Sequence, residues 1–198
     1  WTRDGRVKAD VVTISADVAG TVTDVMVRDN QMVKQGDVLF VVDKARYQNA
    51  LAQANALLAA QQVEKGRRGK EASRRAALDS SIVSVESMET AQFAVGTASA
   101  QYQAALAARD LAQLNLERTV VRAPVSGYVT NLNVHAGDFA AVGAAKLAVI
   151  GSDSFYVVGY FEETKLPLLK VNDPVQVRLM SGAAQLNGHI ESIAHGIT

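Results

Sequence analysis

The chain has 198 residues, in which 20 Lys and Arg balance 20 Asp and Glu, and aromatic residues make up 6%. A neutral chain with few aromatics lacks the basic, base-stacking surface that nucleic-acid binding requires. The sequence contains no cysteine, which excludes disulfides, thiolate metal sites and cysteine nucleophiles, and it has no run of about 18–20 apolar residues that could span a bilayer.

Residues 7–43 have the pattern of β-structure. Val18, Val22, Val25 and Val27 alternate with polar residues at an imperfect period of two, and Val38 to Val42 form a continuous apolar run. Two turn signals separate these stretches, at 29–31 and at 34–37. We therefore expect several short strands before residue 44.

The same pattern recurs 107 residues later. Seven positions of the first stretch are occupied by the same residue in the second: Ala16, Val18, Gly20, Val22, Thr23, Val27 and Gly36 recur as Ala123, Val125, Gly127, Val129, Thr130, Val134 and Gly143. An internal repeat fixes architecture before local detail does. It predicts one β domain built from 9–43 and 119–151, in which Gly20, Gly36, Gly127 and Gly143 serve as structural turn glycines.

Residues 44–118, between the two repeats, have the composition of a helical hairpin. They contain no proline and are rich in Ala, Gln, Leu, Arg and Glu. Apolar residues fall on alternating steps of three and four, as in the seam of a coiled coil: Tyr47, Leu51, Ala54 and Leu58, then Met88, Ala91, Val95, Ala98, Tyr102, Ala105, Ala112 and Leu116, with Arg109 in the one missing place. We expect two antiparallel helices, each about 50 Å long. They should break near Asp79 to Ser81, with Ser84 as the N-cap of the second helix.

The far half of this hairpin should be marginally stable. From Gln61 to Arg75 the first helix loses its apolar stripe and carries Gly66 and Gly69, each costing up to about 1 kcal/mol against alanine. We expect the hairpin to pack against neighbouring hairpins or against a partner. The basic residues between Lys65 and Arg75 have three interpretations: a solvated face, a weakly supported nucleic-acid surface, or a docking site for carbonyl and carboxylate groups.

After the second repeat, 152–198 alternate again and predict part of a second β domain, a partial β-barrel, with 1–8 as a candidate addition. The overall fold class expected is mixed α and β and elongated: a split lipoyl-like domain, interrupted by an antiparallel coiled-coil hairpin and followed by the barrel.

The sequence offers no catalytic, cofactor or metal site that outweighs simpler interpretations. His135, His189 and His195 lack metal-site spacing, and no nucleophile motif or phosphate-binding loop occurs. The segment Val41 to Ala45 resembles a lipoyl turn, which makes Lys44 a candidate carrier lysine. A carrier lysine needs the tip of a tight turn, whereas Lys44 precedes a long helical stretch, so we favour a helix start capped by Asp43.

Three segments, in this order and spacing, carry a family resemblance: Val18 to Asp43, Arg122 to Val129, and Val158 to Leu166. The chain resembles the periplasmic adaptor, or membrane fusion protein, family (HlyD-like) of Gram-negative tripartite efflux and type I secretion systems. The nearest subgroup is that of aromatic-acid and multidrug exporters. The resemblance implies a non-enzymatic protein in the periplasm, anchored to the inner membrane through an N-terminal helix that precedes this chain.

The resemblance also implies partners and a docking site. The partners are an inner-membrane transporter, an outer-membrane channel and further copies of the chain, with no cofactor and no nucleic acid. An Arg, a Leu and a Ser at the hairpin tip contact the channel in many family members. The matching positions here are Arg74, Leu78 and Ser84, with Arg75 as a substitute for Arg74. The alternatives are a lipoyl or biotinyl carrier and a coiled-coil scaffold without a transport role.

Overall fold

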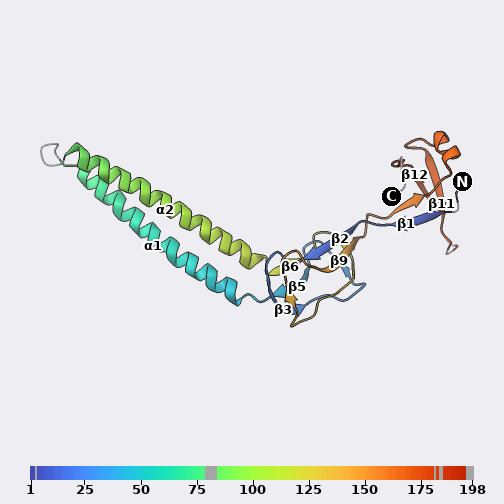
Figure 1. Ribbon diagram of the computed structural model, residues 1–198, viewed down its shortest axis with the longest axis horizontal. Helices are drawn as coiled ribbons and strands as arrows, with labels where there is room; N and C mark the ends of the chain where they lie inside the picture. Colours follow the sequence, from blue (N-terminus) through green and yellow to red (C-terminus); the bar gives the residue numbers. More distant parts are fainter. Residues whose placement is uncertain (3, 79–83, 181, 183–184, 195–198) are drawn as a thin grey trace. The chain divides into compact units, whose positions relative to one another are not determined.

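The computed structural model describes residues 1–2, 4–78, 84–180, 182 and 185–194. These residues form two compact units (Figure 1). The larger unit comprises 10–154 and holds the two repeats and the hairpin between them. The smaller comprises 1–9 together with 155–198.

Two four-stranded antiparallel sheets make up the β domain of the larger unit. The first has the order β2 (Val11–Ser15), β9 (Ala145–Gly151), β7 (Gly127–Thr130) and β4 (Met32–Val33). The second has the order β6 (Val120–Arg122), β5 (Val38–Val42), β3 (Gly20–Val25) and β8 (Phe139–Ala140). Adding 107 to the first residue of β3, β4 and β5 gives the first residue of β7, β8 and β9, so the two sheets are repeats of one another.

Each sheet contains strands from both repeats. The short strand of each repeat pairs with a strand of the other repeat. Met32 of β4 pairs with Tyr128 of β7, and Phe139 of β8 pairs with Thr21 of β3. The halves are therefore interleaved and share one core. Repeated positions fill it in pairs, and its buried members include Ala16 and Ala123, Val22 and Val129, Val27 and Val134, Phe40 and Leu147, and Val42 and Val149.

The hairpin leaves and re-enters this domain at one place. The backbone N–H of Val42, at the end of β5, donates to the carbonyl of Thr119, just before β6, over 2.8 Å. Tyr47 adds a side-chain anchor, since its buried ring carries a hydroxyl that donates to the Ala19 carbonyl over 2.7 Å. The excursion from 44 to 118 thus begins and ends on neighbouring strands of one sheet.

Helices α1 (Ala45–Ala76) and α2 (Val85–Glu117) run antiparallel, side by side (Figure 1). The seam predicted for α2 faces α1: Ala91, Ala98 and Ala105, at steps of seven, are its buried residues. On α1 the polar residues of the far half take seam positions. There the ammonium of Lys65 lies over the ring of Tyr102, 4.7 Å from its centre. Within the described residues, no helix is long and apolar enough to cross a membrane.

The smaller unit contains two antiparallel strand pairs and a short 3₁₀ helix. Strand β1 (Gly5–Lys8) pairs with β10 (Tyr156–Gly159), and β11 (Pro174–Arg178) pairs with β12 (Gln185–His189). The 3₁₀ helix η1 spans Glu163–Leu168.

Candidate functional site at the hairpin tip

The helix ends at the tip are closed by local hydrogen bonds. At the end of α1 the Ala77 N–H donates to the Ser73 carbonyl, and the Leu78 N–H donates to the Arg75 carbonyl, both over 3.2 Å. At the start of α2 the Ser84 hydroxyl oxygen accepts from the Ser87 N–H over 3.2 Å, which confirms the predicted N-cap. The predicted break at Asp79 to Ser81 lies outside the described residues.

The two adjacent arginines of the tip differ in what they contact. Arg75 is half-buried: one of its terminal nitrogens donates to both the carbonyl and the hydroxyl of Ser87, and the other contacts Glu71 over 2.7 Å. Arg74 is exposed, and among the described residues no hydrogen bond or ion pair engages its guanidinium. Arg75 therefore holds α1 to α2, whereas Arg74 has donors to offer to a partner.

Leu78 supplies an apolar group beside these charges. Its side chain is 49% exposed two residues past the end of α1. The hydroxyl oxygen of Ser84 already accepts the capping hydrogen bond, so its O–H remains able to donate. The described part of the tip thus offers a guanidinium, an isobutyl group and a hydroxyl, which suits a protein surface with carbonyl or carboxylate acceptors.

Further from the tip, much of the basic stretch is neutralised within α1. Glu64 accepts hydrogen bonds of 2.7–2.8 Å from Arg67 and Arg68. These bonds, first from Arg67 and then from Arg68, lower the pKa of the Glu64 carboxyl from 4.5 to about 2. Local pairing of this kind favours a solvated helical face here and weakens the nucleic-acid interpretation.

Acid titration should show this pairing directly. An unfolded glutamate titrates near 4.5, so the stabilisation from the Glu64 pair is complete above that pH and is lost as the pH falls toward about 2. We expect the ¹³C carboxyl resonance of Glu64 to titrate with a midpoint of about 2. The Arg67→Gln/Arg68→Gln double variant should return the midpoint toward 4.5. A native midpoint already near 4.5 would contradict the hydrogen-bonded arrangement.

Lys44 does not occupy a carrier position. It is the N-cap residue of α1, with helical φ and ψ, and the Asp43 carboxylate accepts from the Ala45 N–H over 2.9 Å. A 32-residue helix follows where a carrier domain has a tight turn. In the part of the chain that the structure describes, no group of three His, Asp or Glu residues could hold a metal ion.

The four repeat glycines serve two different purposes. Gly36 and Gly143 lie in turns with φ of +92° and +76°, a conformation that side chains disfavour. Gly20 and Gly127 are not turn residues, because each is the first residue of a strand. There they allow close approach: a Cβ on Gly127 would lie 1.9 Å from the Ile150 carbonyl oxygen.

Sequence reasoning did not single out Phe93. This residue of α2 is 75% exposed, although it lies in a helix that packs through its small residues. A signal was available, since Phe93 follows the seam residue Ala91 by two positions. At about 100° per residue that places it on the opposite face of the helix.

Two family models match the chain. The first, described as "pHBA AAEA subunit, alpha-helical hairpin domain", matches 45–117, and the second, described as "AAEA-like beta-barrel domain", matches 154–198. Together they cover more than half of the sequence, in the order of the hairpin and the second unit. The chain belongs to the AAEA-like family that both models describe.

Solved structures share the fold of this adaptor. The membrane fusion protein Spr0693 from Streptococcus pneumoniae R6 has a TM-score of 0.76 at 18% identity, over 97% of this chain and 82% of its own. A MacA-MexA chimera containing the Pseudomonas aeruginosa MexA α-hairpin has a TM-score of 0.73 at 24% identity, over 97% and 67%. A candidate efflux transporter from Bacteroides eggerthii has a TM-score of 0.68 at 18% identity, and the match covers 94% of this chain but only 56% of that one.

The names of these neighbours describe a membrane fusion protein, a MacA-MexA chimera and an efflux transporter. Their structures confirm the mixed α and β fold class with its inserted helical hairpin.

Proposed function

We propose that this protein is the periplasmic adaptor subunit of a tripartite efflux or secretion system. It links an inner-membrane transporter to an outer-membrane channel for the export of drugs or aromatic acids. Several copies assemble into a ring or sheath so that substrate bypasses the periplasm. Attachment to the inner membrane of a Gram-negative cell is expected through an N-terminal anchor outside this chain.

The observation that carries this proposal is the hairpin inserted into a closed β domain. Both ends of the hairpin are held at the Val42–Thr119 hydrogen bond, so the tip residues lie one hairpin length away from the sheets. Helices of 32 and 33 residues span about 48 Å, a length that suits bridging better than catalysis.

We assign separate tasks to the parts of the chain. The lipoyl-like domain, 9–43 with 119–151, supports the hairpin, 44–118. The partial barrel, 152–198 with 1–8, faces the transporter. The tip, through Arg74, Leu78 and Ser84, binds the channel.

Replacing Leu78 with aspartate should abolish channel docking and reduce export at least about tenfold, because a charge replaces an apolar contact at the centre of the interface. Leu57→Asp is the matched control, since Leu57 is also on the hairpin, is 50% exposed, and lies about 30 Å nearer the root. Export of a fluorescent substrate and co-purification with the channel measure the effect, and circular dichroism checks the fold. Equal export by both variants would refute the tip assignment.

Substitution of each tip arginine should affect a different property, either channel docking or hairpin stability. Arg74→Ala should weaken co-purification with the channel and leave the melting of the hairpin unchanged, because its guanidinium is exposed. Arg75→Ala should lower the melting temperature of the hairpin, because Arg75 links Glu71 to Ser87 across the helices. The reverse assignment of these two effects would make Arg75 the docking residue.

A further inference from the structure

Two glycines of α1 have no role inside the hairpin. A Cβ on Gly66 or Gly69 would meet nothing within 4 Å, and neither residue has a positive φ. Each still costs the helix up to about 1 kcal/mol relative to alanine. The fold of a single copy therefore does not explain why side chains are missing at these two positions.

Together the glycines create a hollow on the outer surface of α1. It is shallow and open to solvent, and it is lined by Gly66, Arg67, Gly69, Lys70, Ser73 and Arg74. Its floor is backbone and small residues, and its sides are Arg67, which Glu64 already pairs, and the side chains of Lys70 and Arg74. Such a hollow has room for a large apolar group from another helix, flanked by acidic residues.

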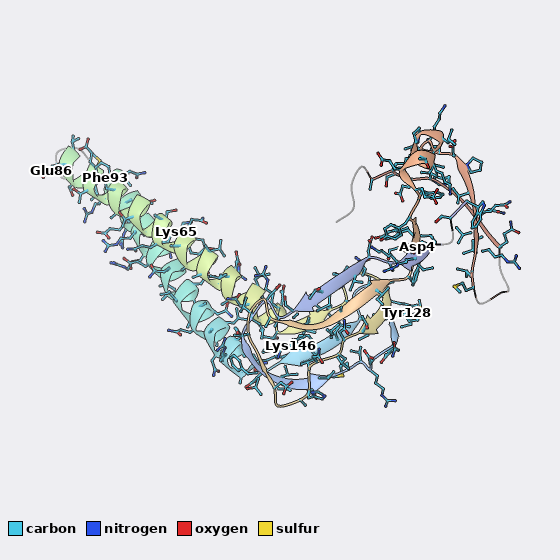
Figure 2. The ribbon with its side chains drawn as sticks, turned by 45° about the vertical axis from the view of Figure 1, so that its right-hand side comes forward. Asp4, Lys65, Glu86, Phe93, Tyr128 and Lys146 are labelled. Carbon is cyan, nitrogen blue, oxygen red and sulfur yellow. The ribbon has the colours of Figure 1, made fainter. Side chains whose placement is uncertain are left out.

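A group of that description lies on α2 of the same chain. Phe93 is 75% exposed and lies on the face opposite the seam with α1, and Glu86 lies before it on the same helix (Figure 2). Glu89, between them in sequence, is also exposed. No salt bridge within the described residues engages either glutamate. An exposed phenylalanine with acidic neighbours on α2 thus complements an empty basic hollow on α1.

The two features lie at the same height along the hairpin. Near the tip, Arg75 of α1 contacts Ser87 of α2. Ala50 and Ala112 each lie 25 residues further from the tip and line one cavity, so the two helices keep the same register along their length. Gly69 is six residues from Arg75 and Phe93 is six residues from Ser87, which puts both about 9 Å below that contact. By the same count, Glu89 is level with Ser73, between Lys70 and Arg74.

We infer that Phe93 of one copy inserts into the Gly66–Gly69 hollow of the next copy, with Glu89 pairing with Lys70 of that copy. This inference rests on the proposed ring. In a ring whose axis runs parallel to the hairpins, every copy places a given residue at the same position along the axis. Two residues at the same position along one hairpin are therefore also at the same position when they belong to neighbouring copies. Because the contact joins α2 of one copy to α1 of the next, it is heterologous, as a closed ring requires.

Disulfide cross-linking tests the contact on a background without cysteine. The Gly69→Cys/Phe93→Cys double variant of the full 198-residue chain should form dimers, trimers and longer ladders under a mild oxidant. Each single variant should form none, because a heterologous contact never places position 93 against position 93. The Val63→Cys/Phe93→Cys pair is the control, since Val63 is exposed but its height differs by about 9 Å, beyond the reach of a disulfide.

Several outcomes would overturn the inference. Dimers of the single Phe93→Cys variant would show that identical faces pack together. Cross-links from Gly69→Cys to a channel subunit in cells would assign the hollow to the channel. If the chain self-associates in analytical sedimentation but the double-cysteine variant forms no cross-linked ladder, the contact is refuted and the proposed ring is not. If the chain is strictly monomeric, both are refuted. The Leu78→Asp export assay tests the adaptor role separately.

Filling the hollow provides a second test that a general loss of folding cannot imitate. Gly69→Leu should raise the thermal stability of the single copy, because leucine is the better helix former. It should also weaken self-association about tenfold or more, because Phe93 can no longer be buried. Unchanged self-association in a more stable variant would contradict the proposed fit.

Discussion

Replacing Phe40 with alanine should lower the free energy of unfolding of the β domain by about 3–5 kcal/mol. Phe40 is the largest of the fully buried side chains, and it lies in a core to which both repeats contribute. Its loss leaves a cavity that residues of both sheets line, so neither half can collapse alone to fill it. Urea denaturation followed by circular dichroism of the β signal measures the change.

Phe93→Ala provides the matched control for this prediction. The same substitution removes the same atoms from a side chain that is 75% exposed, so the stability of a single copy should change by at most about 0.5 kcal/mol. Leu147→Ala, at the position that repeats Phe40, should cost about 2–5 kcal/mol. Similar small losses at all three positions would mean that the two halves do not share a packed core.

Replacing Gly127 with alanine should be comparably damaging, at about 3 kcal/mol or more. The new Cβ would lie 1.9 Å from the Ile150 carbonyl oxygen, 2.7 Å from its carbonyl carbon and 3.1 Å from the Gly151 Cα. All three are backbone atoms of β9, which pairs with β7 at this point. Relief of the clash therefore requires separating two central strands, and thermal unfolding should report the loss.

The internal repeat supplies a control at the equivalent position. A Cβ on Gly20 would lie 2.7 Å from the Val42 Cγ1, which is one side-chain atom and not backbone, so Gly20→Ala should cost less than Gly127→Ala. Gly96→Ala, in α2 with nothing within 4 Å, should instead stabilise the chain by up to about 1 kcal/mol. A different order of these three variants would show that backbone contact does not set the cost at Gly127.

The sequence repeat predicted the two-part β domain but not how its strands are shared. Matching residues such as Val22 and Val129 required equivalent environments, and the structure buries both in one core. The exchange of β4 and β8 between the sheets was not predictable, because each strand has only two residues. So short a segment carries no periodicity, and its partner is decided by how the turn before it folds.

At the tip, the candidate residues came from the resemblance, while the different contacts of Arg74 and Arg75 needed coordinates. A glutamate four residues before an arginine indicates the Glu71–Arg75 pair from sequence alone. The contact between Arg75 and Ser87 depends on the height at which two helices meet, which no local pattern sets. For the same reason, the sequence did not predict that Phe93 and Gly69 lie at the same position along the hairpin.

The hydrogen bond that joins Val42 to Thr119, beside the pairing of β5 with β6, has an evolutionary consequence. The two ends of the hairpin join the β domain at adjacent strands. The hairpin can therefore be shortened, extended or exchanged without changing the β domain. Removing seven residues from each helix would preserve the seam and shift the tip by about 10 Å. The reach of the hairpin can thus be adjusted in heptad steps while the β domain stays the same.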